Sequence, residues 1–198
     1  MLKLLARFLM FLAGWKVDMN FPKEANYCVM TAAPHTSNWD AFYLICGFVI
    51  LDIPYKFTIK SEWMKPPMGW LLKPLGALGI DRNKKIKGKK SSYVEQMVAL
   101  FEGKERMAMV IPPEGTRGFN DRWKMGFYHT ALKANVPITF GYLDYEKKVA
   151  GVGGVIYPTG DIAEDMKKVH AFYSTIAPKY KELFSLDRRY LEEGKQQK

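Results

Sequence analysis

Short apolar runs alternate with helix-length segments along most of this 198-residue chain. The runs have the length and composition of buried strands, and several of them end at a proline or a charged residue. Alternation of this kind is typical of an α/β domain built on one central sheet. The predicted strands are residues 27–33, 55–60, 106–111, 136–145 and 149–157, with one more that ends at Asp81-Arg82.

The predicted helices lie between these strands, and a basic loop at residues 84–90 separates two of the elements. The last two strands are adjacent in sequence with a short turn between them, so the sheet is expected to be mixed. We therefore predict an α/β fold, a single domain with a central mixed sheet flanked by helices. The predicted helices cover residues 41–53, 91–102, 123–134 and 161–180.

The charge and the cysteine content narrow the class of protein. Lys and Arg number 30 against 20 Asp and Glu, and the net charge of +10 favours anionic partners such as nucleic acid, phosphorylated metabolites or an acidic membrane. Hydrophobic residues make up 48% of the chain, which excludes a disordered or simple coiled-coil protein. Cys28 and Cys46 each lie in an apolar run, which favours a reducing compartment over a disulfide framework or a zinc site.

The first sixteen residues, MLKLLARFLMFLAGWK, form the one segment that suggests a membrane. Lys3 and Arg7 interrupt its apolar residues, so it is too short to span a bilayer, and it lacks a clean signal-peptide cleavage site. Basic residues beside Leu, Phe and Trp suit a helix that lies in the headgroup region, whereas the alternative is a helix packed on the domain. We expect residues 1–16 to be an amphipathic, membrane-associating helix and residues 17–198 to form the domain.

His35 and Asp40 are the residues best placed for acid–base chemistry. Two side chains five positions apart on one helix point in different directions. His35 and Asp40 can therefore meet only if His35 lies in a loop and Asp40 in the first helical turn. A carboxylate there can fix the imidazole tautomer and stabilise the imidazolium that forms when histidine takes a proton. The alternative is structural, because Ser37 and Asp40 also match a capping box at a helix N-terminus. Both roles can hold at once.

Cationic residues follow two of the predicted strands. The segment 112–118 (PPEGTRG) comes directly after a buried strand, where glycines allow close approach of a ligand and Arg117 offers a planar donor suited to phosphate. An ordinary turn with a solvated arginine is the alternative. Arg82 also follows a strand, and it opens a lysine-rich cluster that is either an anion-binding surface or a solvated loop.

Several common site signatures are missing from the sequence. It has no G-x-S-x-G, no G-x-G-x-x-G and no P-loop motif, which leaves a serine-hydrolase elbow and nucleotide binding unsupported. Its three histidines lack metal-ligand spacing, so we expect no metal. No nucleic-acid recognition module is recognisable, and we expect no nucleic-acid partner.

Four stretches in this order resemble the glycerolipid acyltransferase superfamily, specifically the lysophosphatidic acid acyltransferase type. Residues 35–40 (HTSNWD) match its HX4D motif, and residues 79–82 (GIDR) resemble its second block. Residues 113–117 (PEGTR) match the third block and residues 136–138 (VPI) the fourth. The resemblance covers roughly two thirds of the chain, from about residue 25 to about residue 160.

The resemblance implies acyl transfer from acyl-CoA or acyl carrier protein to the hydroxyl of a lysophospholipid, most simply 1-acylglycerol-3-phosphate. His35 would be the general base and Asp40 would orient it, and no cofactor beyond the acyl thioester is implied. It also implies a peripheral or monotopic enzyme on the cytoplasmic face of an anionic cell membrane. The residues that would bind the acceptor's glycerol phosphate are Arg82, Glu114, Gly115, Thr116 and Arg117.

Two departures from the family pattern bear on the acceptor. Pro112 stands where the family usually has phenylalanine, and Gly118 where it often has serine. A different hydroxylated lipid or small acceptor is therefore the main alternative, and a non-catalytic protein that binds anionic lipid or nucleic acid is another. The apolar segment around Trp63 and Trp70 is expected either to contact the acyl chain or lipid or to belong to the core.

Overall fold

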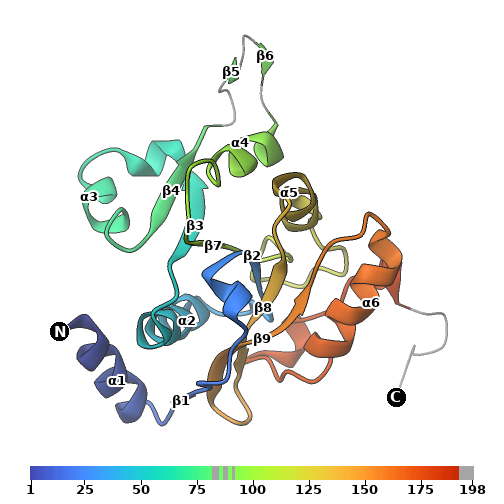
Figure 1. The fold of residues 1–198 in the computed structure, drawn as a ribbon. Helices are drawn as coiled ribbons and strands as arrows, with labels where there is room; N and C mark the ends of the chain where they lie inside the picture. The colour runs from blue at the N-terminus through green and yellow to red at the C-terminus, as the bar shows by residue number, and fades with distance from the viewer. Residues whose placement is uncertain (82–84, 87–88, 91, 192–198) are drawn as a thin grey trace.

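A seven-stranded sheet runs through the molecule in the order β1-β9-β8-β2-β7-β3-β4 (Figure 1). The computed structural model describes residues 1–81, 85–86, 89–90 and 92–191. The strands of this sheet are β1 (Lys16–Val17), β2 (Tyr27–Ala32), β3 (Tyr55–Lys60), β4 (Ala77–Ile80), β7 (Met107–Ile111), β8 (Ile138–Asp144) and β9 (Val149–Ile156). A separate antiparallel pair consists of β5 (Lys85–Ile86) and β6 (Lys89–Lys90).

The neighbouring strands of the large sheet are parallel except for the β8–β9 hairpin, which is antiparallel. The predicted mixed sheet is thereby confirmed, and the antiparallel pair is the one that the short connection in the sequence indicated. The central strand β2 is buried on both faces, as expected for a parallel strand covered by helices. Cys28, Met30 and Ala32 pack into the core on one face, and Val29 packs into the core on the other.

Helices cover the two faces of the sheet as two layers (Figure 1). α1 and α2 pack with the core cluster on one face, whereas α4, α5 and α6 contribute to the cluster on the other. The helices are α1 (Leu2–Leu12), α2 (Asn38–Leu51), α3 (Met68–Leu72), α4 (Tyr93–Ala99), α5 (Gly126–Ala134) and α6 (Ile162–Tyr173). Short 3-10 turns lie at Lys23–Asn26, Ser61–Met64, Lys181–Leu183 and Arg188–Tyr190.

Three helices are shorter than the sequence predicted. α4 begins after Ser92, whose side chain and that of Glu95 form a capping box. α5 begins only at Gly126 because the preceding backbone bonds elsewhere, with the Trp123 amide donating to Asp187 at 3.1 Å. α6 ends at Tyr173, well before Pro178.

The carboxyl ends of the parallel strands meet at one edge of the sheet, and this edge positions the site. Thr31 on β2 is paired with Ile111 on β7, so the loops that follow these two strands start side by side. Ala32 is paired with Gly141 on β8, and Lys60 on β3 with Ile80 on β4. In open α/β sheets ligands bind at this edge, outside the carboxyl ends of the strands.

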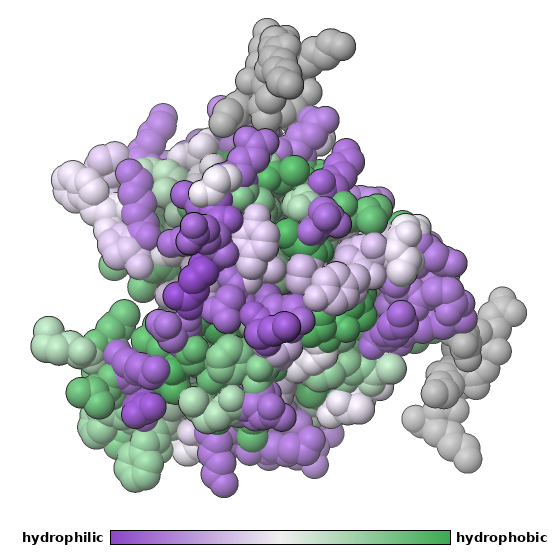
Figure 2. Space-filling model, viewed as in Figure 1, coloured by the Kyte–Doolittle hydropathy of each residue, from purple (hydrophilic) through white to green (hydrophobic). Residues whose placement is uncertain are grey.

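The N-terminal helix α1 is attached to the domain by one narrow side. Ala6 and Met10 are buried against α2, while most of its large apolar side chains are exposed. Figure 2 shows hydrophobic residues gathered where Figure 1 places α1. The exposed set is Leu2, Leu4, Leu5, Phe8, Phe11 and Leu12. α1 therefore packs on the domain along one side and exposes an apolar face on the other.

The segment after α1 is part of the folded domain. Trp15 is buried in the core, and β1 pairs with β9, so the expected boundary after residue 16 falls inside a strand of the sheet. α1 itself ends at Leu12, and residues 13–14 connect it to the buried Trp15.

The aromatic segment before β4 does not belong to the core. Trp63 is 55% exposed, Trp70 72% and Leu71 63%, so the core interpretation of this segment is wrong. Figure 1 shows α3 and α1 on the same side of the molecule. Among the helices of the described residues, none has the length and the apolar character needed to cross a bilayer.

Candidate active site

His35 and Asp40 lie next to each other at the carboxyl edge of the sheet. His35 follows β2 in the loop, and Asp40 is the third residue of α2. The His35 Nδ1 atom lies 3.3 Å from Asp40 Oδ2, and the Asp40 side chain is only 1% exposed whereas that of His35 is 21% exposed. The contact through Nδ1 leaves Nε2 as the nitrogen that can exchange a proton with a ligand.

Hydrogen bonds hold the Asp40 carboxylate in place. Its Oδ2 atom accepts the backbone N–H groups of Thr36 and Ser37, both at 2.8 Å, and Ser37 is the N-cap of α2. The Tyr145 hydroxyl donates to Oδ1 at 2.6 Å. Burial alone would raise the pKa of Asp40, but the bonds from His35, Tyr145 and the Ser37 amide outweigh it and hold that pKa below its ordinary value. The capping box and the histidine–carboxylate contact therefore coexist.

Glu114 lies beneath this pair instead of at the surface. Its side chain comes from the loop after β7, and its Oε1 atom accepts the backbone N–H of His35 at 2.9 Å. Glu114 is 3% exposed, and burial raises its pKa to about 7. This bond joins the first and third sequence blocks directly, since the strands that carry them are neighbours in the sheet.

The rest of the segment 112–118 forms a tight turn at the rim. Gly115 has a φ of +67°, a conformation that residues with a Cβ rarely adopt, which explains a glycine here. The side chain of Asn120 holds the turn by donating to the Glu114 carbonyl at 2.6 Å. Thr116 and Arg117 are exposed, so their side chains are available to a ligand.

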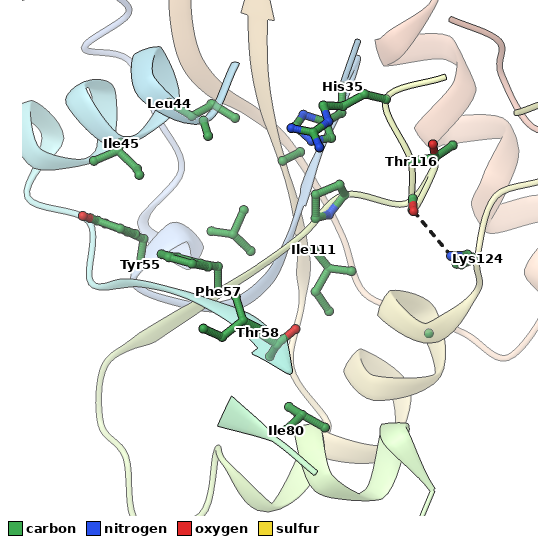
Figure 3. A pocket seen from close by; sticks show the side chains of 18 of the residues that line it. His35, Leu44, Ile45, Tyr55, Phe57, Thr58, Ile80, Ile111, Thr116 and Lys124 are labelled. Carbon is green, nitrogen blue, oxygen red and sulfur yellow. Dashed lines mark hydrogen bonds between the residues drawn. The ribbon is translucent and has the colours of Figure 1, made fainter. Parts of the chain in front are cut away.

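Lys124 adds a cation that sequence reasoning did not single out. Its backbone N–H donates to the Pro113 carbonyl at 2.7 Å, and its Nζ lies 3.4 Å from the Gly115 carbonyl oxygen (Figure 3). No motif could have pointed to it, because only the fold brings it to the turn. Arg82, the cation predicted to face the same acceptor, lies outside the described residues.

A cavity of about 1030 Å³ opens beside His35. Figure 3 shows His35 at one end, with Leu44 and Ile45 from α2 and Phe57 from β3 along an apolar wall. Thr116, Arg117 and Lys124 add a polar, cationic part to the lining, and Figure 3 shows Thr116 and Lys124 across the cavity from Leu44 and Ile45. One cavity thus joins a histidine, a cationic rim and an apolar compartment, an arrangement suited to a substrate with an anionic head and an apolar chain.

The fold and the site together place a histidine–carboxylate pair beside a cavity at the carboxyl edge of a mostly parallel α/β sheet. The model of the Acyltransferase family matches residues 18–139, which is more than half of the chain. The chain therefore belongs to this acyltransferase family, as the four sequence blocks indicated.

The fold is similar to that of a solved structure. The chain is similar to the crystal structure of the 1-acyl-sn-glycerophosphate (LPA) acyltransferase PlsC from Thermotoga maritima, with a TM-score of 0.54 and 18% identity. The match covers 87% of this chain and 73% of that one. A comparison with curated proteins found no match.

Replacing Glu114 with glutamine is expected to stabilise the protein at neutral and higher pH. The amide keeps an acceptor for the His35 N–H and removes a buried charge. Because the folded-state pKa of Glu114 is raised from 4.5 to about 7, its contribution to stability is full below pH 4.5 and is lost as pH rises through 7. A shift of this size corresponds to about 3 kcal/mol.

Denaturant unfolding of wild type and Glu114→Gln from pH 4 to pH 8 measures this difference. The free energy of unfolding of the variant should match that of wild type at the acid end and exceed it at the alkaline end. A constant difference across the range would show that the carboxyl is not buried as described.

Proposed function

We propose that this protein transfers an acyl group from an acyl thioester to the free hydroxyl of a lysophospholipid, most simply 1-acylglycerol-3-phosphate. The observation that carries the proposal is the His35–Asp40 pair at the junction of a cationic rim and an apolar cavity. The donor is acyl-CoA or acyl carrier protein, and the reaction needs no further cofactor.

In the proposed mechanism His35 Nε2 takes the proton of the acceptor hydroxyl as its oxygen attacks the thioester carbonyl. Asp40 holds the neutral imidazole with Nδ1 protonated and stabilises the imidazolium that forms. The tetrahedral intermediate expels the thiolate, which recovers the proton from His35. No acyl-enzyme is required, in keeping with a sequence that lacks a G-x-S-x-G elbow.

The acceptor phosphate is assigned to the rim of the cavity. Arg117 and Thr116 offer a guanidinium and a hydroxyl, and Arg82 is assigned to the same group from the sequence. Gly115, whose amide donates to the Pro112 carbonyl, is assigned to shaping the turn that presents them. Glu114 is better suited to holding the His35 loop than to touching phosphate, because its buried carboxyl bonds the His35 amide and two anions repel. The apolar wall of the cavity is assigned to an acyl chain.

We assign the protein to the cytoplasmic face of an anionic membrane, with the exposed face of α1 in the headgroup region. Lys3 and Arg7 on this helix would meet the headgroups, each contributing about 1 kcal/mol near an anionic surface. Free cysteines and thioester donors suit a reducing milieu on that side.

Replacing Leu4, Phe8 and Phe11 together with serine is expected to weaken binding to anionic liposomes more than tenfold, since exposed apolar side chains provide the insertion energy. The fold should be retained, because these side chains are exposed while Ala6 and Met10 still anchor the helix. Liposome co-sedimentation beside a thermal melt measures both.

The matched control replaces Leu132 on α5 and Tyr157, which are also exposed, with serine. This variant should sediment with liposomes as wild type does. If both variants bind alike, α1 is not the membrane contact. A truncation that serves the same purpose should remove only residues 1–12, so that the buried Trp15 is kept.

The acceptor class is tested by supplying one acyl-CoA with lysophosphatidic acid or with the matching monoacylglycerol. Turnover that depends on the phosphate supports the phosphorylated acceptor, whereas equal turnover identifies a different hydroxylated lipid as the substrate. Liposome binding without any acyl transfer would leave the non-catalytic alternative.

A further inference from the structure

The hydroxyl of Tyr145 contacts the buried end of the histidine–carboxylate pair. Tyr145 follows β8, whose carboxyl end lies beside that of β2, and it donates to Asp40 Oδ1 at 2.6 Å. None of the sequence blocks includes it. The other carboxylate oxygen accepts two backbone amides and faces His35, so Tyr145 supplies the side-chain bond to Oδ1.

The position of Tyr145 is itself fixed from several sides. Its backbone N–H donates to the Ala177 carbonyl at 2.9 Å, and the next turn is held by the Asp144 carboxylate, which accepts the amides of Glu146 and Lys147. The Trp15 ring packs edge-on against the Tyr145 ring, with 4.9 Å between centroids. These contacts fix the ring of Tyr145, so its hydroxyl stays directed at Asp40 Oδ1.

A carboxylate that accepts hydrogen bonds at only one of its oxygens can rotate about its Cβ–Cγ bond. Such a rotation would change which oxygen faces His35. The two backbone amides fix Oδ2 from one side and the phenol fixes Oδ1 from the other. Because Asp40 is 1% exposed, water cannot readily replace the phenol as a donor.

We propose that Tyr145 is a positioning residue of the acyltransferase site, which acts through Asp40 to keep His35 in the orientation and tautomer of a general base. The inference rests on the proposed function. It also links the site to the N-terminal segment, since Trp15, which packs on Tyr145, lies three residues after the end of α1.

The test compares Tyr145→Phe with Tyr142→Phe in the full-length protein. Tyr142 lies on β8, the strand that Tyr145 follows, and its hydroxyl also donates to a carboxylate, Asp18 at 3.0 Å, away from the cavity lining. Both variants lose one tyrosine–aspartate bond. Tyr145→Phe is expected to lower kcat about tenfold with KM for donor and acceptor unchanged, whereas Tyr142→Phe keeps the wild-type kcat.

A second measurement repeats Tyr145→Phe in an Asp40→Asn background. If Tyr145 acts through Asp40, its effect on kcat should shrink to less than about twofold there, because coupled residues are not additive. An equal loss of kcat in both tyrosine variants, or a full tenfold loss in the Asp40→Asn background, would overturn the inference. A wild-type protein with no acyl transfer would instead overturn the proposed function.

Discussion

His35→Ala is expected to lower kcat for acyl transfer by about 10²–10⁴-fold, the usual contribution of a positioned general base. The side chain is partly exposed at the cavity, so its removal leaves the core intact. KM for both substrates should change little, because the imidazole acts on the proton and neither the anionic head nor the acyl chain depends on it. Steady-state kinetics with thiol release as readout measures the loss.

Asp40→Asn separates catalysis from capping at the same position. The asparagine oxygen can still accept the amides of Thr36 and Ser37 at the start of α2, but a neutral amide cannot stabilise an imidazolium. We expect kcat to fall severely while the melting temperature falls only slightly. Near-wild-type turnover with an unchanged melting temperature would reduce Asp40 to a helix cap.

Arg117→Ala is expected to raise KM for a phosphorylated acceptor about ten- to hundredfold, with little change in KM for the donor. A charge-assisted hydrogen bond to phosphate is worth about 1.5–3 kcal/mol, and it is made in the ground state as well as in the transition state. The same variant should leave turnover of a non-phosphorylated acceptor unchanged, so the two acceptors serve as internal controls.

Arg122→Ala is the matched control for the arginine at the rim. Arg122 is exposed and five positions further along the same loop, but it does not line the cavity. Its loss removes the same charge and should leave KM near the wild-type value. If both variants raise KM alike, the effect is the overall charge of the loop and not a phosphate site at Arg117.

Much of the fold could be predicted because a buried strand is recognisable from a short apolar run in the sequence. A run such as residues 27–32 is apolar at nearly every position and is followed by a proline, which is enough to place a central strand. The β8–β9 hairpin was also predictable from the short connection between two apolar runs. The ends of helices were harder to predict from the sequence. α5 starts later than predicted because Trp123 contacts Asp187, which is 64 positions away in the chain.

The site could be predicted only where its residues are close in sequence. His35 lies in the loop before α2 and Asp40 lies in the first turn of that helix. Their spacing alone therefore indicated that the side chains could meet. The positions of Glu114, Lys124 and Tyr145 depend on which strands are neighbours. A tyrosine directly after a strand is a weak signal, and only pairing of β8 with β2 gives it meaning.

The central claim is tested most directly by following the acyl group itself. The full-length protein would be incubated with lysophosphatidic acid and an acyl-CoA labelled with carbon-13 in the acyl chain, and the lipids analysed by mass spectrometry. The proposed function predicts label in phosphatidic acid with wild type and none with His35→Ala. Label released only as free fatty acid, or the same labelled product from both proteins, would contradict it.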